Sequence, residues 1–192
     1  MKIGVLAIQG DFAEHIVMLK RLGVETSEVR LPHQLDGLDG LILPGGESTT
    51  IGKLCVDYKL LEPLCEFGKS RGIWGTCAGA ILLSRDARRS QPLLGIMDIT
   101  VARNAFGRQV DSFEAELNID ELNRATQTNA PYHAVFIRAP IIESVSGEAS
   151  VLAALPDGRI VAAQQGKLLA TSFHPELTQD PRFHAYFISL LG

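Results

Sequence analysis

One pentapeptide constrains the fold of this chain more than any other stretch. It reads Gly75-Thr76-Cys77-Ala78-Gly79, and it follows a short apolar run and precedes an apolar run with helical character. Small residues on both sides of one reactive side chain are typical of a nucleophile elbow, a sharp turn from a strand into a helix, here with cysteine in place of serine. The pentapeptide therefore predicts a strand and a helix joined by a turn that presents Cys77.

Length, charge and cysteine content narrow the class of protein. A chain of 192 residues can form one domain that buries about 70% of the surface of its unfolded state. A net charge of -4 gives no general attraction to nucleic acid or anionic membranes. Three cysteines without CxxC spacing favour reduced thiols in a cytoplasm, and the histidines form no zinc pattern. We expect no metal and no cofactor. The apolar run at residues 1–8 is too short to cross a bilayer.

The first half of the chain predicts a parallel sheet covered by helices. Apolar runs of strand length lie at residues 2–8, 24–30, 41–43 and 73–74, and helical patterns lie at residues 12–22, 51–55 and 59–70. Strands that alternate with helices favour parallel pairing. At the start of the first helix, Asp11 followed by Glu14 resembles a capping box.

The second half predicts a different architecture. Short strand-like runs lie at residues 98–102, 112–118, 134–139, 150–155, 159–163 and 168–172, with a closing helix at residues 180–191. Hairpin turns at residues 156–158 and 165–167 indicate antiparallel pairing. The chain is thus expected to form one α/β domain over residues 1–192. Its central, mostly parallel sheet is flanked by helices and carries an antiparallel extension in the second half.

Two loops are expected to meet at one edge of this sheet. The glycine pair Gly45-Gly46 follows the third predicted strand, and Cys77 follows the fourth. The carboxyl ends of parallel strands meet at one edge, where ligands bind. Glycines there free backbone N–H groups, so Gly45, Gly46 and Ala78 are candidates for an oxyanion hole.

A third segment supplies a base for the cysteine. His174 and Glu176 follow the last predicted strand. Histidine can take and return the proton that thiol chemistry requires, and a carboxylate can orient the imidazole. A His-Pro-Glu tripeptide alone is more often a surface turn. A catalytic role is predicted here because the tripeptide follows a strand and the chain also contains the Cys77 turn.

The remaining cysteines and histidines are given structural roles. Cys55 and Cys65 lie in apolar helical patterns and are expected to pack in the core. The other four histidines are assigned to helix faces, turns or the surface; they are His15, His33, His133 and His184.

The motifs at residues 75–79 and 173–176 together resemble those of the class I (triad) glutamine amidotransferases. Further runs narrow the resemblance to the family of glutaminase subunits of pyridoxal 5'-phosphate synthases; they lie at residues 4–10, 43–50, 103–114 and 136–140. The resemblance covers nearly the whole chain, and only residues 123–133 match no pattern of the family.

The resemblance implies an activity and a set of site residues. The activity is hydrolysis of L-glutamine to glutamate and ammonia, with Cys77 as nucleophile, His174 as base and acid, and Glu176 as orienting residue. The implied glutamine contacts are Gly46, Glu47, Ser48, Arg103, Ile137 and Arg138. Chemistry alone does not choose the arginine that binds the substrate carboxylate, because Arg103, Arg108 and Arg138 are all eligible.

The resemblance also implies a partner. Ammonia would pass to a barrel-shaped pyridoxal 5'-phosphate synthase subunit in a large hetero-oligomer, and the isolated chain would be weakly active. Two other classes stay open, a free-standing cysteine hydrolase and a non-catalytic binding subunit. The runs at residues 46–48 and 103–114 argue against a free-standing cysteine hydrolase, which would not need them. The intact set of Cys77, His174 and Glu176 argues against a non-catalytic subunit.

Overall fold

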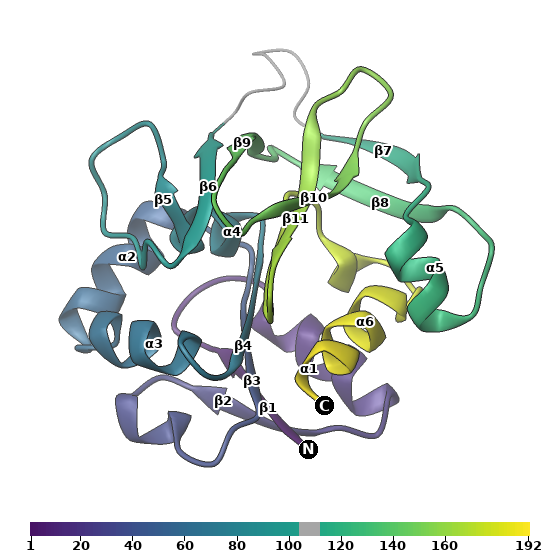
Figure 1. Cartoon of the computed structure of the whole chain (residues 1–192). Coiled ribbons are helices and arrows are strands. Elements are labelled where there is room, and N and C mark those ends of the chain that lie inside the picture. Colours follow the sequence, from purple (N-terminus) through teal and green to yellow (C-terminus); the bar gives the residue numbers. More distant parts are fainter. Residues whose placement is uncertain (104–111) are drawn as a thin grey trace.

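A sheet of ten strands forms the centre of the part of the chain that the structure describes (Figure 1). The computed structural model describes residues 1–103 and 112–192. The strands of this sheet are β1 (Lys2–Leu6), β2 (Glu25–Val29), β3 (Gly40–Leu43), β4 (Gly72–Thr76), β5 (Ser84–Asp86), β6 (Met97–Ala102), β9 (Ile141–Val145), β10 (Ser150–Ala154), β11 (Ile160–Gln165) and β12 (Leu168–Thr171). Their order is β2-β1-β3-β4-β12-β11-β9-β6-β5, with β10 paired to β11.

Five neighbouring strands, from β2 to β12, are parallel. In their register Leu43 of β3 lies opposite Gly75, and Thr171 of β12 lies opposite Thr76. The loops after β3, β4 and β12 therefore leave the sheet at the same edge. This confirms the predicted meeting of the glycine pair with the cysteine turn.

The rest of the sheet is largely antiparallel, as predicted for the second half. Strand β11 runs antiparallel to β12, β9 and β10, and β6 runs antiparallel to β9. A separate hairpin joins β7 (Ser112–Leu117) to β8 (Tyr132–Ile137). Two strands were not predicted, β9 and the three-residue β5, which contains Arg85 and Asp86 and offers no apolar run.

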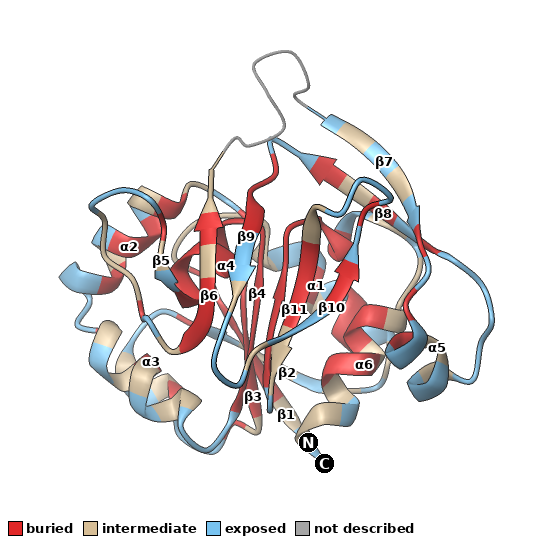
Figure 2. Ribbon diagram, turned by 45° about the horizontal axis from the view of Figure 1, so that its top comes forward, coloured by how far each residue is buried: buried red, intermediate tan, exposed pale blue. Residues whose placement is uncertain are grey.

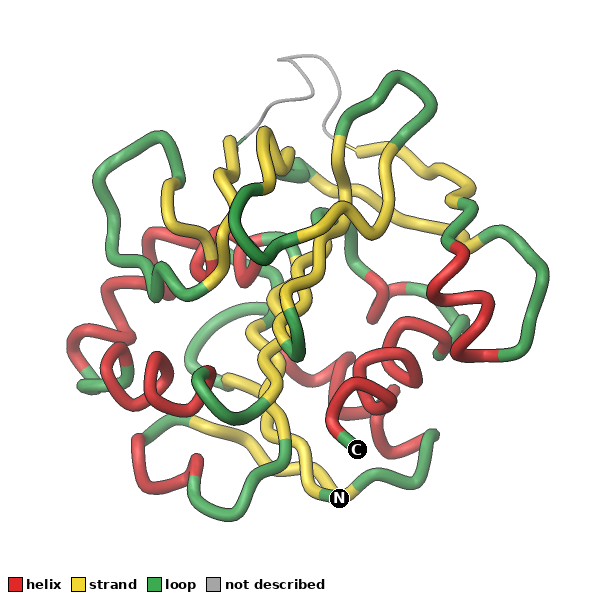
Figure 3. Tube along the Cα trace, viewed as in Figure 1, coloured by secondary structure: helices red, strands yellow, loops and turns green. Residues whose placement is uncertain are grey.

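Helices cover both faces of the sheet (Figure 3). One face carries α2 (Ser48–Asp57), α3 (Leu61–Gly68) and α4 (Ala78–Leu83), and the other carries α1 (Phe12–Arg21), α5 (Asp120–Thr126) and α6 (Arg182–Leu191). Alternation along β3 separates the two cores, since Leu41 and Leu43 pack on one face and Ile42 on the other. Figure 2 shows the buried residues concentrated on the central strands.

The region without a recognised pattern has a local structure of its own. Residues 123–133 form the end of α5, the connection that follows it and the first two residues of β8. Gln127 ends the helix in the left-handed conformation with φ of 52°.

The start of α1 differs from the prediction. Asp11 is the N-cap residue, but its side chain makes no capping hydrogen bond, so the predicted capping box is wrong. Its backbone N–H donates to the carbonyl oxygen of Gly45 at 3.1 Å, which ties this turn to the loop after β3. The carboxylate lies at the sheet edge instead, with Oδ2 3.7 Å from Nδ1 of His174.

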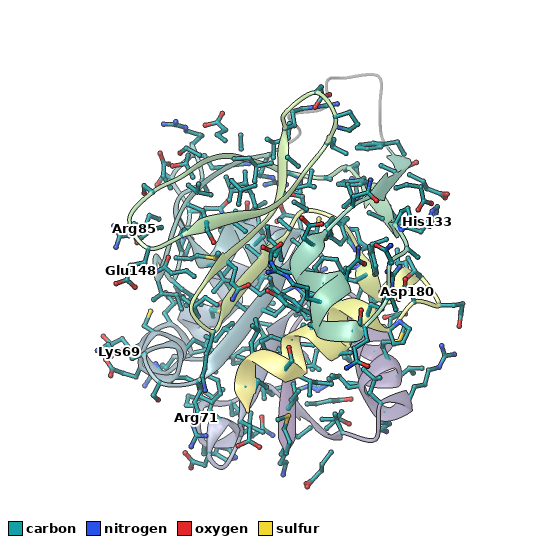
Figure 4. The ribbon with its side chains drawn as sticks, turned by 45° about the vertical axis from the view of Figure 1, so that its right-hand side comes forward. Lys69, Arg71, Arg85, His133, Glu148 and Asp180 are labelled. Atoms are coloured by element: carbon teal, nitrogen blue, oxygen red, sulfur yellow. The ribbon has the colours of Figure 1, made fainter. Side chains whose placement is uncertain are left out.

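The described helices are all too short or too polar to cross a bilayer. Figure 4 shows charged side chains at the periphery, with Lys69, Arg71 and Arg85 on one side and His133 on the other.

Candidate active site

Cys77 occupies a strained turn between β4 and α4. Its backbone has φ of 48° and ψ of -103°, an unusual conformation for any residue other than glycine. The N–H of Cys77 donates to the carbonyl oxygen of Thr171 at 2.8 Å, which fixes the turn on β12. A side chain at Gly75 would come within 2.4 Å of the backbone of Gly79, so the small flanking residues are a steric requirement. These features are those predicted for a nucleophile elbow.

His174 follows β12 and lies beside Cys77. Its N–H donates to the carbonyl oxygen of Val135 at 2.9 Å, and its Nδ1 lies 2.7 Å from Oε1 of Glu176. The side chains of His174 and Cys77 line the same pocket and interact electrostatically. Burial by itself lowers the pKa of His174, but the contacts with Cys77 and Glu176 outweigh it and raise the pKa to about 10. The imidazole therefore holds a proton strongly when a thiolate lies beside it.

Glu176 is buried in the short 3-10 helix η2 (Pro175–Leu177), with 6% of its surface exposed. Burial raises its pKa and the hydrogen bond from His174 opposes that rise. Pro175 separates the two residues and begins η2, which holds their side chains on the same side of the segment. The geometry is that of a carboxylate that orients an imidazole.

One pocket of about 450 Å³ opens at this edge. Its volume suits a small ligand. It is lined by Gln9, Asp11, Gly46, Glu47, Ser48, Cys77, Ala78, Ile81, Arg103, Ile137, Arg138, Pro140, His174 and Leu177. All six residues implied as glutamine contacts are thus in one pocket with Cys77 and His174. Arg108, the third eligible arginine, lies outside the described residues, as do residues 104–111 of the family run.

The three candidates for the oxyanion hole have different positions. Gly46 and Ala78 line the pocket beside Cys77. Gly45 lies behind the imidazole, because a Cβ atom there would be 2.6 Å from Cε1 of His174. Their role as donors to an oxyanion stays a prediction.

Arg103 and Glu47 form an ion pair at the pocket wall. The guanidinium Nη2 lies 2.8 Å from Oε1 of Glu47, and Nη1 donates to Oγ1 of Thr49 at 3.2 Å. The other carboxylate oxygen of Glu47 caps α2 through the N–H of Thr50 at 2.8 Å. Burial raises the pKa of Glu47, but the hydrogen bonds from Thr50 and the charge of Arg103 lower it overall. The pair is therefore preorganised before a substrate enters.

Asp11, His174 and Glu176 are spaced closely enough to be considered as metal ligands, since one ligand atom of each lies within 4.8 Å of the others. Two nitrogen or oxygen ligands of a tetrahedral metal lie roughly 3.3 Å apart, given metal distances of about 2.0 Å. The 2.7 Å separation of His174 Nδ1 and Glu176 Oε1 fits a direct hydrogen bond better.

A second groove lies at the amino ends of β4 and β12, away from Cys77. It includes Lys69, Arg71 and Arg85, which Figure 4 labels. Each of these cations is paired with an acid; the acids are Glu66, Asp39 and Asp98. The groove has no nucleophile and base arranged as in the pocket at the opposite edge, within the described residues.

The predicted core positions of Cys55 and Cys65 are confirmed. Cys55 is fully buried, and burial raises its pKa to about 12. Cys65 packs against the same core. His33 and His133 are exposed, as expected for turn and surface residues.

His15 and His184 are the residues whose position the sequence did not reveal. Both lie on helix faces, in α1 and α6, but both are fully buried. Nε2 of His15 lies 3.3 Å from Oε2 of Glu176, so this histidine adjoins the predicted triad. No short motif contains His15 and Glu176 together, and only folding places them in contact.

The chain resembles known proteins along its full length. Residues 5–191 match the model of the SNO glutamine amidotransferase family. A relative from Herpetosiphon aurantiacus named pyridoxal 5'-phosphate synthase subunit PdxT is 58% identical over 99% of this chain and 100% of its own length. A relative of the same name from Moorella thermoacetica is 55% identical, with both chains covered completely. A solved structure described as a glutamine amidotransferase superposes with a TM-score of 0.91 and 49% identity, and covers 99% of this chain and 98% of its own.

Proposed function

Because the chain belongs to the SNO glutamine amidotransferase family, we propose that it hydrolyses L-glutamine at Cys77 and supplies the ammonia to pyridoxal 5'-phosphate synthesis. The observation that carries the proposal is that Cys77 and His174 line one pocket, with Nδ1 of His174 2.7 Å from Oε1 of the buried Glu176. The whole chain, residues 1–192, acts as the glutaminase domain.

The first half of the reaction forms a thioester. The Cys77 thiolate attacks the side-chain amide carbon of glutamine, and the carbonyl oxygen becomes an oxyanion. Backbone N–H groups of Ala78 and of the Gly45-Gly46 segment stabilise that oxyanion. The C–N bond then breaks, and the departing nitrogen takes the proton of the His174 imidazolium, so that ammonia leaves.

The second half regenerates the enzyme. His174, now neutral, takes a proton from water, and the oxygen attacks the thioester carbon. The C–S bond breaks and glutamate leaves, which restores the thiolate beside the imidazolium. Glu176 keeps Nδ1 of His174 protonated and directs the other ring nitrogen toward Cys77 throughout.

The pocket wall provides recognition of the amino acid. A glutamine molecule carries an α-carboxylate and an α-ammonium group, and Arg103 can bind the carboxylate with paired N–H donors. Main-chain groups of Gly46, Glu47, Ile137 and Arg138, with Ser48, surround the rest of the substrate. We assign these contacts from their presence in one pocket with Cys77.

The relatives are named as subunits of a synthase, so we infer a second subunit that receives the ammonia. A barrel-shaped subunit in a large hetero-oligomer would keep ammonia from being protonated and diluted in water. We place the reaction in the cytoplasm, since the three cysteines are unpaired thiols.

Glutamate release from glutamine, measured with and without a cognate synthase subunit, tests the proposal. We expect turnover with glutamine that rises when the partner is added. Equal turnover of unrelated amides would favour the free-standing cysteine hydrolase instead. No turnover with glutamine and partner together would rule the proposal out.

A further inference from the structure

Behind the triad lies a buried cluster of polar side chains that the reaction does not use. His15 and His184 are fully buried, and Nδ1 of His15 lies 3.0 Å from Nε2 of His184. The indole ring of Trp74 packs edge-on against both imidazoles, with centroid distances of 5.6 Å and 4.9 Å. Two imidazoles in an apolar site need hydrogen bonds that offset their lost hydration, so the partners of His15 are informative.

The other nitrogen of His15 points at the catalytic residues. Nε2 lies 3.2 Å from Oγ1 of Thr76, the residue before the nucleophile, and 3.3 Å from Oε2 of Glu176. Oε2 of Glu176 has no hydrogen-bond partner in the part of the chain that the structure describes. Nε2 of His15 is therefore a nitrogen within reach of Oε2 of Glu176, a buried carboxylate oxygen that needs a hydrogen-bond donor.

The contacts favour one tautomer of each imidazole. A lone pair on Nε2 of His15 would face the carboxylate oxygen at 3.3 Å and repel it, so Nε2 carries the hydrogen. Nδ1 of His15 is then an acceptor, and Nε2–H of His184 donates to it. Nδ1 of His184 is left without a hydrogen, in agreement with its lack of a hydrogen-bond partner among the described residues. Burial lowers the pKa of both histidines, which keeps both rings neutral.

We propose that His15 is a positioning residue of the triad. Its Nε2–H, which bonds Thr76 and lies 3.3 Å from Oε2 of Glu176, favours the ionised carboxylate and keeps it aligned with Nδ1 of His174, while it fixes the strand end that carries Cys77. His15 touches no reacting atom, so it acts through Glu176. The inference rests on the proposed function only where activity is measured.

The titratable neighbours of Glu176 determine how the loss of His15 should change the pH dependence of activity. The titratable groups that face it or face His15 are His174, Asp11, His15, Tyr132 and His184. His15 supplies an N–H to the carboxylate, and its removal makes the carboxylate form less favourable. Protonation of Glu176 then occurs at higher pH, so the acid limb of the activity profile moves upward.

Three substitutions of His15 separate positioning from packing. Phenylalanine keeps a planar ring and removes both nitrogens, glutamine places an N–H close to the position of Nε2, and asparagine reaches only the position of Nδ1. We expect His15→Phe to lower kcat roughly 10- to 100-fold, as for the loss of a hydrogen bond to a charged group, with KM changed less than about twofold. We expect His15→Gln to recover most of that loss and His15→Asn to recover little.

The pH profile is the decisive readout. His15→Phe should move the acid limb of kcat/KM upward by about one pH unit, and His15→Gln should return it toward the original position. Leu19→Val, one turn further along the buried face of α1, is the matched packing control and should leave the limb in place. An unshifted limb in His15→Phe, or equal effects of glutamine and asparagine, would overturn the proposal. If the phenylalanine variant does not fold, the comparison of glutamine with asparagine decides.

A second measurement needs no glutaminase activity. The rate at which iodoacetamide alkylates Cys77, followed by mass spectrometry of its peptide across pH 5–9, reports the thiolate held beside His174. His15→Phe should raise the pH midpoint of alkylation and His15→Gln should not. An unchanged midpoint in His15→Phe would count against the inference even if the unsubstituted chain proved inactive on glutamine, whereas inactivity with a shifted midpoint would count only against the proposed function.

Discussion

Nδ1 of His174 lies 2.7 Å from Oε1 of Glu176, and both side chains are almost completely buried. A hydrogen bond between a charged acceptor and an imidazole N–H is strengthened in such a site, because water cannot compete for either group. The pair is therefore suited to hold the imidazole of His174 in one orientation toward Cys77.

Replacement of Cys77 by alanine should remove turnover and leave the fold intact. The side chain is small and lies at a strained turn, so its loss creates little cavity. We expect glutamate release with the partner subunit to fall at least roughly 10³-fold, as in other catalytic triads, and glutamine binding to persist. Calorimetric titration with glutamine checks the binding. Retained turnover would identify another nucleophile.

His174 and Glu176 should differ in the severity of their loss. His174→Asn removes the base and acid and should be nearly as damaging as loss of Cys77. Glu176→Gln keeps a hydrogen-bonding side chain near Nδ1 and should leave residual activity, since Glu176 orients the ring without touching the substrate. Single-turnover rates at saturating glutamine compare the two variants. Full activity of either variant would remove that residue from the triad.

Gly45 is predicted to be required for the position of the imidazole. A Cβ atom at this residue would lie 2.6 Å from Cε1 and 3.0 Å from Nδ1 of His174. Gly45→Ala should therefore displace the ring and lower kcat about 10- to 100-fold, with a small change in unfolding temperature. Gly158, in an exposed turn with open space around it, gives the control. Gly158→Ala should lower stability by about 1 kcal/mol because its φ is positive, and leave kcat unchanged.

The two buried histidines should make the folded chain sensitive to acid. Burial lowers the pKa of His184 to about 3, and burial with the neighbouring His184 and His174 lowers that of His15 well below its usual range. Below about pH 6.5 the unfolded chain takes a proton at each position and the folded chain does not, so the free energy of unfolding falls as the pH falls. Each histidine contributes a slope of up to about 1.4 kcal/mol per pH unit.

Urea unfolding between pH 7.5 and 4.5 tests this expectation. His184→Phe should reduce the slope by up to about 1.4 kcal/mol per pH unit, because it removes one of the two buried imidazoles. His33 is exposed, so its imidazole contacts water in both states and His33→Gln serves as the control. An equal slope in His184→Phe and the unsubstituted chain would contradict the assigned burial.

The elements that could be predicted are those with a strong local signal. The parallel strands are apolar runs, and glycines or reactive residues follow β3, β4 and β12 at one edge. The short strand β5 and the hydrogen bond from the Asp11 N–H to the carbonyl oxygen of Gly45 depend on residues that are distant in the sequence. Local patterns carry no information about such contacts.

The residues proposed for catalysis stand in recognisable sequence motifs, but the side chains that pack behind them do not. Cys77, His174 and Glu176 belong to runs that resemble a family. His15 is an ordinary helical residue by its spacing, and its contacts with Thr76 and Glu176 arise only when α1 packs on the sheet. The polar neighbours of His15 are Thr76, Glu176 and His184, which come from three separate segments of the chain. No local pattern therefore reveals the role of His15.

The structure distinguishes two of the three arginines that could bind the substrate carboxylate. Arg103 is held by Glu47 and Thr49, so its guanidinium is fixed at the pocket wall. The side chain of Arg138 makes no hydrogen bond or ion pair within the described part of the chain, and the backbone of this residue has φ of 42°. Substrate recognition by the side chain is therefore expected at Arg103, and recognition by the main chain at Arg138.

Two substitutions test this division. Arg103→Lys keeps the charge but removes the planar pair of donors, so it should raise KM for glutamine roughly 10- to 100-fold and change kcat little. Arg138→Ala keeps the main chain and should change KM less than about threefold. Steady-state kinetics with the partner subunit measure both. If Arg138→Ala raised KM more than Arg103→Lys, the carboxylate would belong to Arg138, because only a side-chain contact is lost in that variant.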